Sequence, residues 1–549
     1  MDDTTAVGLV ERLTRSFGDL ETRFHGAYWD AATYATHENE ARSAELELGL
    51  RRAKGDPAAL AQVEAELEAG GRDRILRRQL EVLRQSLLGN QMDDDLRSEI
   101  VALSNSITSD FASHRPQLGG TEVSDNDIQE VLERSDDEAE RRRAWEASKE
   151  IGVVVAERVM KLAELRNSAA HAAGFSDYYS MSLALQELPQ EELWARLTLL
   201  EELTREPYTT WKSALDDHLA SRFGATELEP WHYADPFFQT VPSNGGVALD
   251  GHFAGLEAQH LAEVSFRRWG IDLAGVLAQS DLFPRAGKSQ HAFCIQMDRK
   301  EDVRILANIV PGQRWVEVML HESGHAAYDA CIDPSLPYLL RRPAHTFVTE
   351  GMAIMSGRLA RDPRWLVDVA AIQPGVISQI EEELHRTTRA ASLLFARWGL
   401  VMVHFERALY QDPTADLDEL WWQLVERFQL VRRPPDRRAP DWAAKVHIAT
   451  VPVYYQNYLL GEMLATQLRT AIERDLDAHL VGAPAAGRWL DERLFAPGAS
   501  LRWDDLVRSA TGRELSPEDF AVSLTGSSLE GNGDRAVGST RRSRETQGE

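Results

Sequence analysis

A His-Glu-x-x-His motif at residues 321–325 has the spacing of a metal-binding pair. If residues 314–331 form a helix, His321 and His325 lie one turn apart on one face, with their Cβ atoms about 5–6 Å apart. Glu350 is the candidate third ligand, because it is the only acidic residue in an apolar segment where a lone carboxylate needs a partner. Two imidazoles and one carboxylate predict a zinc site whose fourth position is open for water.

Glu322 lies beside the first histidine but is rotated off the face that binds the metal. From there its carboxylate can reach the water on the metal, so we expect Glu322 to be the general base. A glutamate is basic enough for this role because zinc lowers the pKa of bound water to about 7. The motif therefore indicates a zinc hydrolase, and the alternative is an accidental match or an inactive descendant.

A second group of candidate residues follows about a hundred positions after Glu350. We expect Pro452 in the first turn of a helix, so that Tyr458 projects on the same side as Tyr454 or Tyr455. Peptide hydrolysis develops negative charge on the carbonyl oxygen, and a phenol together with the imidazole of His447 would stabilise it. Ordinary core aromatics and a capping histidine are the alternative, and the spacing leaves open which tyrosine acts.

Composition limits the classes of partner. The 549 residues contain 60 basic and 87 acidic side chains, a net charge of −27, which argues against nucleic acid and anionic membranes as partners. Two cysteines imply no disulfide framework and suit a reducing compartment, so we expect a cytoplasmic protein. The N-terminus lacks the features of a signal peptide, and no run of eighteen apolar residues occurs, so neither secretion nor membrane insertion is expected.

Helical periodicity dominates the chain, with apolar residues three and four apart across residues 6–115, 137–172, 188–222 and 364–480. The part between 223 and 313 is richer in Gly, Pro and aromatics, and predicts two short strands at 290–297 and 303–309. Placed just before the motif helix, they would form a small sheet beside the metal. An exposed edge of that sheet could pair with an extended peptide.

These motifs together resemble the helical gluzincin peptidases. The resemblance rests on His-Glu-Ser-Gly-His-Ala-Ala-Tyr, on Glu350 twenty-nine residues after the first histidine, and on the downstream His…Tyr-Tyr…Tyr-Leu…Glu segment. The families are those of thimet oligopeptidase, neurolysin and the bacterial oligoendopeptidases, and of angiotensin-converting enzyme with its dipeptidyl carboxypeptidase relatives. Residues 164–179 resemble the oligopeptidase side and residues 27–36 the converting-enzyme side. The resemblance covers most of residues 20–520.

The resemblance implies a mainly α fold. It implies a two-lobed helical body with a deep central channel, and a small β-sheet beside the zinc site, as in neurolysin and the converting enzyme. Residues 1–524 would form a single catalytic domain, and residues 525–549, with almost no apolar content, would be a disordered polar tail. Such a channel admits short peptides and excludes folded proteins.

The resemblance also implies roles for individual residues. His321, His325 and Glu350 would hold one Zn²⁺ per chain, Glu322 would be the base, and Tyr458 with His447 would stabilise the transition state. One residue fewer than on the oligopeptidase side separates His447 from Tyr458, so Tyr455 or Tyr454 remains an alternative. The segment starting at His291, Ala292 and Phe293 would bind the substrate backbone, with Tyr454 also contacting substrate.

The expected function is zinc-dependent hydrolysis of peptide bonds in short peptides. A peptidyl-dipeptidase that releases C-terminal dipeptides, or an inactive peptide-binding relative, is the alternative. The choice depends on whether a basic residue meets the C-terminus of the substrate, and Lys288, Arg285 and Arg304 are the candidates. Ile354 stands where the converting-enzyme side has an aspartate that supports a histidine ligand, so Asp329 is the candidate for that support. The oligomeric state stays open.

Overall fold

The computed structural model describes residues 4–70, 73–242 and 249–525. Its first five helices are α1 Thr4–Thr33, α2 His37–Lys54, α3 Pro57–Glu68, α4 Arg74–Leu88 and α5 Asp94–Ser113. The next group is α6 Asp125–Arg134, α7 Glu138–Ala147, α8 Glu150–Ala172, α9 Tyr178–Leu185, α10 Gln190–Phe223, α11 Asp250–Phe253, α12 Ala258–Arg268 and α13 Ala274–Gln279. The remaining helices are α14 Gln313–Cys331, α15 Thr346–Gly357, α16 Pro363–Asp368, α17 Pro374–Gln411, α18 Leu417–Gln429, α19 Val446–Thr450, α20 Tyr455–Leu476, α21 Pro484–Leu490, α22 Trp503–Thr511 and α23 Glu518–Thr525.

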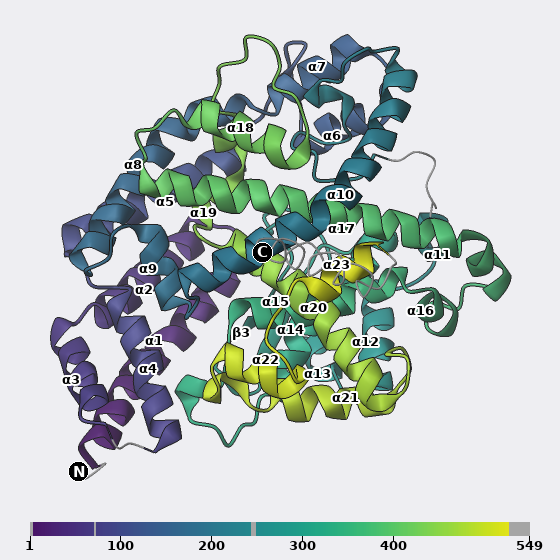
Figure 1. The fold of residues 1–549 in the computed structure, drawn as a ribbon. Coiled ribbons are helices and arrows are strands. Elements are labelled where there is room, and N and C mark those ends of the chain that lie inside the picture. The colour runs from purple at the N-terminus through teal and green to yellow at the C-terminus, as the bar shows by residue number, and fades with distance from the viewer. Residues whose placement is uncertain (1–3, 71–72, 243–248, 526–549) are drawn as a thin grey trace, which may run out of the picture.

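Short 3₁₀ segments and two small hairpins complete the described chain. The 3₁₀ segments are η1 Pro230–His232, η2 Tyr338–Leu340, η3 Arg358–Arg361, η4 Asp441–Ala444 and η6 Gly498–Ser500, and η5 Asp491–Phe495 is a π-helical turn. The strands are β1 Gln117–Leu118, β2 Thr121–Glu122, β3 Phe293–Gln296 and β4 Val303–Leu306. The expected mainly α fold with a small sheet is confirmed (Figure 1).

The helices form where the periodicity predicts them. The motif helix expected at 314–331 is α14, which begins one residue earlier. Asp56 caps α3 by accepting a hydrogen bond from the backbone N–H of Ala58, with Pro57 as the first helical residue. None of the helices in the described ranges combines the length and the apolar character needed to cross a bilayer.

Two apolar cores hold the helices together. The larger contains buried side chains from α5 through α23, and the smaller joins α1, α3 and α4 to Leu339 and Leu340 of η2. In Figure 1, α17 crosses the middle of the molecule, with α18 on one side and the group α14, α15 and α20 on the other. That group carries the histidine motif, Glu350 and Tyr458, whereas His447 lies in α19 and Tyr454 directly precedes α20.

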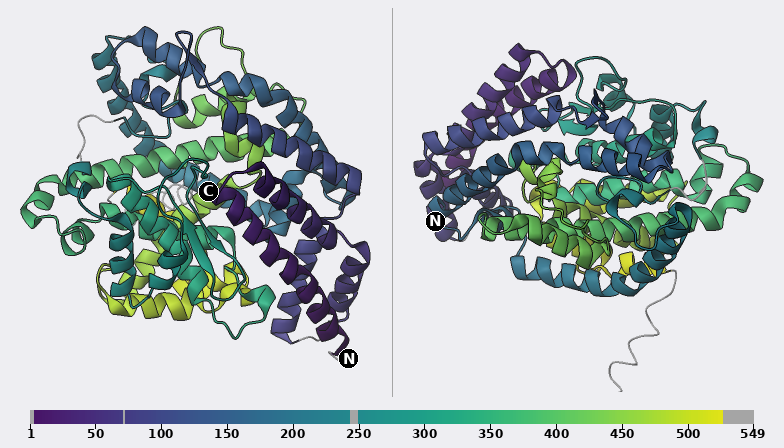
Figure 2. Two further views of the ribbon diagram at one scale, coloured as in Figure 1. Left: turned by 180° about the vertical axis from the view of Figure 1, so that it is seen from behind. Right: turned by 90° about the horizontal axis from the view of Figure 1, so that it is seen from above.

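The sheet next to the motif helix is the antiparallel pair β3–β4, with Phe293 opposite Leu306 and Gln296 opposite Val303. The two expected strands are thus confirmed, although each is shorter than predicted. α1 runs toward the centre of the molecule (Figure 2, left), where Trp29 packs edge-on against Phe293. Within the described ranges, β3 pairs with no strand on its other side, so that edge of the hairpin is open.

The structure corrects two sequence predictions. Pro452 does not lie in the first turn of a helix, because α19 ends at Thr450 and α20 starts only at Tyr455. Between them Val453 has a φ of 52°, and its N–H donates to the buried carboxylate of Glu406, which fixes the turn. Thr525, the first residue of the predicted tail, is the last residue of α23, and the rest of that predicted tail, residues 526–549, lies outside the described ranges.

Candidate metal centre

The centre lies where α14, α15 and α20 cross, and glycines allow the close approach. A Cβ on Gly324 of α14 would lie 2.8 Å from the Cα of Ala353 in α15. A Cβ on Gly461 of α20 would lie 3.1 Å from the Cβ of Glu350. Real Cβ atoms rarely have such close neighbours, so larger residues would push the helices apart. The packing of the three helices therefore sets the distance between the motif histidines and Glu350.

His321, His325 and Glu350 converge on one point. Both Nε2 atoms face the Oε2 atom of Glu350, at 3.7 Å from His321 and 3.8 Å from His325. In the described ranges these residues form the one group of three or more His, Cys, Asp or Glu side chains with metal-binding spacing. Ligands about 2.0–2.2 Å from a tetrahedral zinc lie roughly 3.3–3.6 Å from one another, close to the distances observed.

The protonation states fit a cation better than an ion pair. Burial lowers the pKa of His321 to about 4 and holds the pKa of His325 well below its usual value, so both rings are neutral at pH 7. Glu350 is only 5% exposed, and its Oε2 atom has no hydrogen-bond partner among the described residues. A buried, unpaired carboxylate oxygen facing two neutral imidazoles is costly unless a metal binds there, so the residues present fit zinc.

Two hydroxyl groups hold the candidate ligands in place. Thr349 Oγ1 lies 2.7 Å from His325 Nδ1, which leaves Nε2 of the ring to face the metal position. The hydroxyl of Tyr454 donates to Glu350 Oε1 at 2.7 Å. Asp329 was the expected support for His325, but the structure gives that position to Thr349, which directly precedes Glu350 in α15. Sequence spacing missed Thr349 because its contact crosses from α15 to α14.

Glu322 lies on the wall of the same cavity and is 7% exposed. Burial and the nearby Glu350 carboxylate together raise the pKa of this carboxyl to about 8, although a hydrogen bond from the backbone of Cys294 favours its charged form. A cation between the histidines and Glu350 would favour the charged form of Glu322. The backbone of β3 is thus in direct contact with the candidate base.

Two of the three tyrosines reach the cavity, and the third does not. Tyr458 lines the cavity, and its hydroxyl has no hydrogen-bond partner in the described part of the chain. Tyr455 points into the core, where its hydroxyl accepts a hydrogen bond from Trp398 Nε1 at 2.7 Å, and it is 5% exposed. The ring of His447 lies 6.4 Å from that of Tyr458, and its buried Nδ1 atom has no partner among the described residues. The structure therefore brings Tyr454 and Tyr458 to the cavity and sets Tyr455 apart.

The cavity at the centre has a volume of about 510 Å³. Part of its wall is formed by residues of the β3 segment, namely Ala292, Phe293, Cys294 and Gln296, and another part by the histidines and Glu350. His291 is exposed and is not part of the wall. Of the expected substrate-binding residues, Ala292, Phe293 and Tyr454 thus line the cavity.

The three basic residues proposed to meet a substrate C-terminus are engaged elsewhere. The ammonium of Lys288 is buried and binds the Asp281 carboxylate and the carbonyls of Phe283 and Ala307. Asp281 also pairs with Arg285, whereas Arg304 pairs with the neighbouring Asp302. None of these cations lies on the cavity wall, so that prediction is wrong. The cations that do line it, Arg299, Arg341 and Arg342, come from loops that strand periodicity does not single out.

Comparison with known families divides the chain into two matched parts. Residues 278–525 match peptidase family M3, and residues 1–204 match angiotensin-converting enzyme. Residues 27–36, expected to resemble the converting enzyme, fall within its match, but residues 164–179, expected to resemble the oligopeptidases, fall there too. No curated protein matches the chain. The two resemblances expected from the motifs are therefore confirmed, each over its own part of the chain. Both families are zinc-dependent peptidases, and the matches support a metallopeptidase that acts on peptides.

Proposed function

We propose that this protein is a zinc metallopeptidase of the gluzincin type that hydrolyses short peptides, with one zinc bound by His321, His325 and Glu350. The observation that carries the proposal is the buried, unpaired Oε2 atom of Glu350, which faces the neutral imidazoles at 3.7 and 3.8 Å. The matches to two zinc-dependent peptidase families support it independently.

When bound, zinc supplies a Lewis acid for the scissile carbonyl and makes water in the site more acidic. Glu322 takes the proton from the attacking water and passes it to the leaving amine. Tyr458 donates its free hydroxyl to the oxyanion that develops on the carbonyl oxygen, and His447 assists from behind it. Tyr454 keeps Glu350 in position through its hydrogen bond.

The substrate backbone would run along the open edge of β3, which lies beside Glu322. Main-chain hydrogen bonds at a strand edge hold an extended peptide without selecting its sequence, and a folded protein cannot offer an extended segment there. This supports an oligopeptidase. A peptidyl-dipeptidase is the second candidate, favoured by the arginines on the cavity wall.

We also propose that residues 1–524 act as one catalytic unit in a reducing, cytoplasmic compartment. Trp29 of α1 packs in one apolar cluster with Met297 and Leu306 around the β3–β4 hairpin, which joins the N-terminal helices to the wall of the cavity. Both cysteines, Cys294 and Cys331, are free, as they would be in such a compartment.

The test is mass spectrometry of a short-peptide library incubated with zinc-loaded protein, with chelator-treated protein as the control. We expect internal cuts that disappear on chelation. Glu322→Gln should keep stoichiometric zinc and lose turnover. Tyr458→Phe should lower kcat by about 10²–10³ with little change in KM, whereas the matched change Tyr455→Phe should be nearly silent. A normal rate in Glu322→Gln would exclude the mechanism, and zinc binding without any hydrolysis would leave a peptide-binding relative.

A further inference from the structure

Arg342 is a cation on the wall of the candidate peptide cavity that no described residue neutralises. It lies in the loop between η2 and α15, next to Arg341 and eight residues before Glu350. Within the described ranges its guanidinium makes no hydrogen bond and no ion pair, whereas Arg299 on the same wall binds the carboxylate of Glu21 at 2.9 Å. A guanidinium offers five N–H donors and remains protonated, so an unpaired one in a cavity is a site for an anion.

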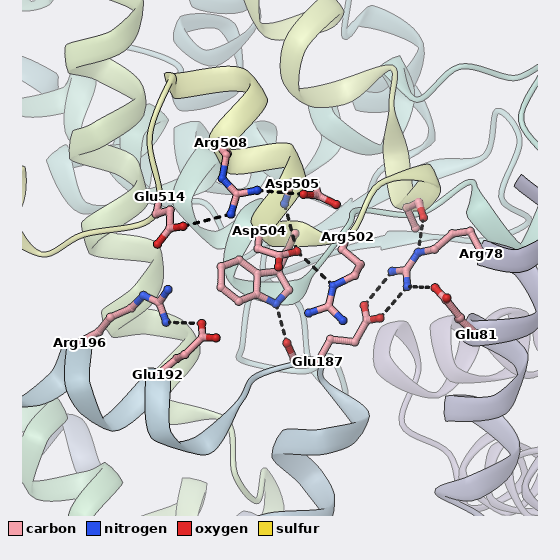
Figure 3. Close-up of polar contacts among 12 residues, drawn as sticks. Arg78, Glu81, Glu187, Glu192, Arg196, Arg502, Asp504, Asp505, Arg508 and Glu514 are labelled. Carbon is pink, nitrogen blue, oxygen red and sulfur yellow. Dashed lines mark hydrogen bonds and ion pairs between the residues drawn. The ribbon is translucent and has the colours of Figure 1, made fainter. Parts of the chain in front are cut away.

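Among the described residues, Glu21 and Glu187 are the carboxylates that act electrostatically on Arg342, and both already have cationic partners. Figure 3 shows Glu187 held by Arg78 through two hydrogen bonds, at 2.6 and 2.7 Å. The other, Glu21, binds Lys54 at 2.7 Å in addition to Arg299. Cations therefore outnumber carboxylates around Arg342, although the chain as a whole carries a net charge of −27.

Electrostatics agrees with this count. Burial, together with the positive charges of Arg299 and Arg78, lowers the pKa of Arg342 to about 10, although Glu21 and Glu187 act in the opposite direction. The charged guanidinium is thus destabilised where it stands, and a carboxylate entering the cavity would relieve it. A bidentate pair of guanidinium and carboxylate is the contact that Arg geometry favours.

The position of Arg342 suits one end of a bound peptide. The cavity wall follows β3 from Cys294, whose backbone contacts Glu322, to Gln296 and then to Arg299 beyond the strand. Residues two apart in a strand lie about 6.5 Å from each other, so this end lies a few peptide residues away from the metal centre. Arg299 contacts the carbonyls of Tyr338 and Leu339 in η2, just before Arg342 in the chain, so Arg342 belongs to that end.

We propose that Arg342 is a specificity residue that binds a carboxylate of the peptide substrate, an inference that rests on the proposed peptidase function of the same cavity. The carboxylate is either the C-terminal one or that of an acidic side chain. If it is the C-terminal one, cleavage occurs at a fixed number of residues from the end of the peptide. The proposal replaces Lys288, Arg285 and Arg304 as the cations that would set that distance.

Binding to the zinc-loaded Glu322→Gln protein provides a test that does not depend on turnover. Isothermal titration would compare two pairs of peptides. The first pair is one peptide as the free acid and as the C-terminal amide. The second pair is amidated at the C-terminus and carries either Glu or Gln at one internal position. If Arg342 pairs with a carboxylate of the peptide, then in one of the two pairs the acidic peptide should bind about 10- to 100-fold more tightly than its neutral counterpart. The pair that shows the preference identifies the source of the carboxylate.

Arg342→Gln in the same background should reduce that preference to about one, while binding of the neutral peptides stays unchanged. Arg342→Lys should keep part of it, because an ammonium retains the charge but not the bidentate geometry. Arg341→Gln is the matched control: it removes the same charge from the same wall, where Arg341 donates its Nε–H to the Leu336 carbonyl. Equal loss in Arg341→Gln would mean general attraction of anions and would overturn the assignment.

Other outcomes are equally decisive. Loss of all peptide binding in Arg342→Gln, for acids and amides alike, would indicate a structural role and also overturn the proposal. Peptide binding with the predicted preference but no hydrolysis by wild-type protein would keep the role of Arg342 and refute the peptidase function. With active protein, mass spectrometry of a ladder of peptide lengths should show cuts at a constant distance from a free C-terminus, and Arg342→Gln should scatter them.

Discussion

Replacing Thr349 by valine tests whether the hydrogen bond behind His325 sets the affinity of the metal centre. The change removes the Oγ1 atom that lies 2.7 Å from His325 Nδ1 and keeps the size of the side chain. The His325 ring is neutral at pH 7, because burial holds its pKa well below the usual value, so its tautomer is free to change once the partner is lost. A fraction of the rings would then carry the proton on Nε2 and be unable to bind zinc.

Loss of such a partner weakens metal binding by about 10- to 100-fold. Thr349 lies on the cavity wall, so water can replace part of the lost contact, and we expect the lower end, about tenfold. This corresponds to about 1.4 kcal/mol of binding free energy.

Competition with a chromophoric zinc chelator at pH 7.5 would measure the dissociation constant, and circular dichroism of the metal-free protein would check the fold. Thr349→Ser keeps the hydroxyl and is the matched control, expected within about threefold of wild type. An unchanged zinc affinity in Thr349→Val, or an equal loss in both variants, would refute the reasoning.

Three further changes test the surroundings of the site. Tyr454→Phe removes the hydrogen bond to Glu350 and should weaken zinc binding by about tenfold in the same competition assay, leaving the melting temperature of the metal-free protein nearly constant. Gly324→Ala places a Cβ 2.8 Å from the Cα of Ala353. Although alanine favours helix, this close contact should lower the free energy of unfolding in urea by about 1–3 kcal/mol and weaken zinc binding. Burial alone would raise the pKa of Glu21, but its cationic partners outweigh burial and lower the pKa from 4.5 to about 2. The ion pairs of Glu21 therefore stabilise the fold above pH 4.5, and this stabilisation is lost as the pH falls toward 2. Glu21→Gln should therefore cost about 3 kcal/mol at pH 7, with a difference in melting temperature from wild type that disappears near pH 2; a difference independent of pH would contradict the assignment.

Local rules were reliable where neighbours in sequence are also neighbours in space. The interval between His321 and His325 is one helical turn, so the motif helix and the shared face followed from spacing alone. The β3–β4 hairpin was likewise accessible because its strands are joined by a short charged turn. The prediction failed at Pro452, where a contact with the distant Glu406 fixes a left-handed turn at Val453 that no local propensity favours.

The sequence alone determined the types of chemical group and their local register: two imidazoles on one helical face, a carboxylate in an apolar segment, and aromatic hydroxyls downstream. Tertiary structure alone decided which groups meet. It turned Tyr455 into the core toward Trp398 and Tyr458 toward the cavity, and it placed Thr349 behind His325. It also left Arg342 without a partner among the described residues, because Glu187 and Glu21 pair with other cations. Such pairings depend on how helices far apart in the chain pack against one another, and helical periodicity fixes the face of a helix but not its neighbour.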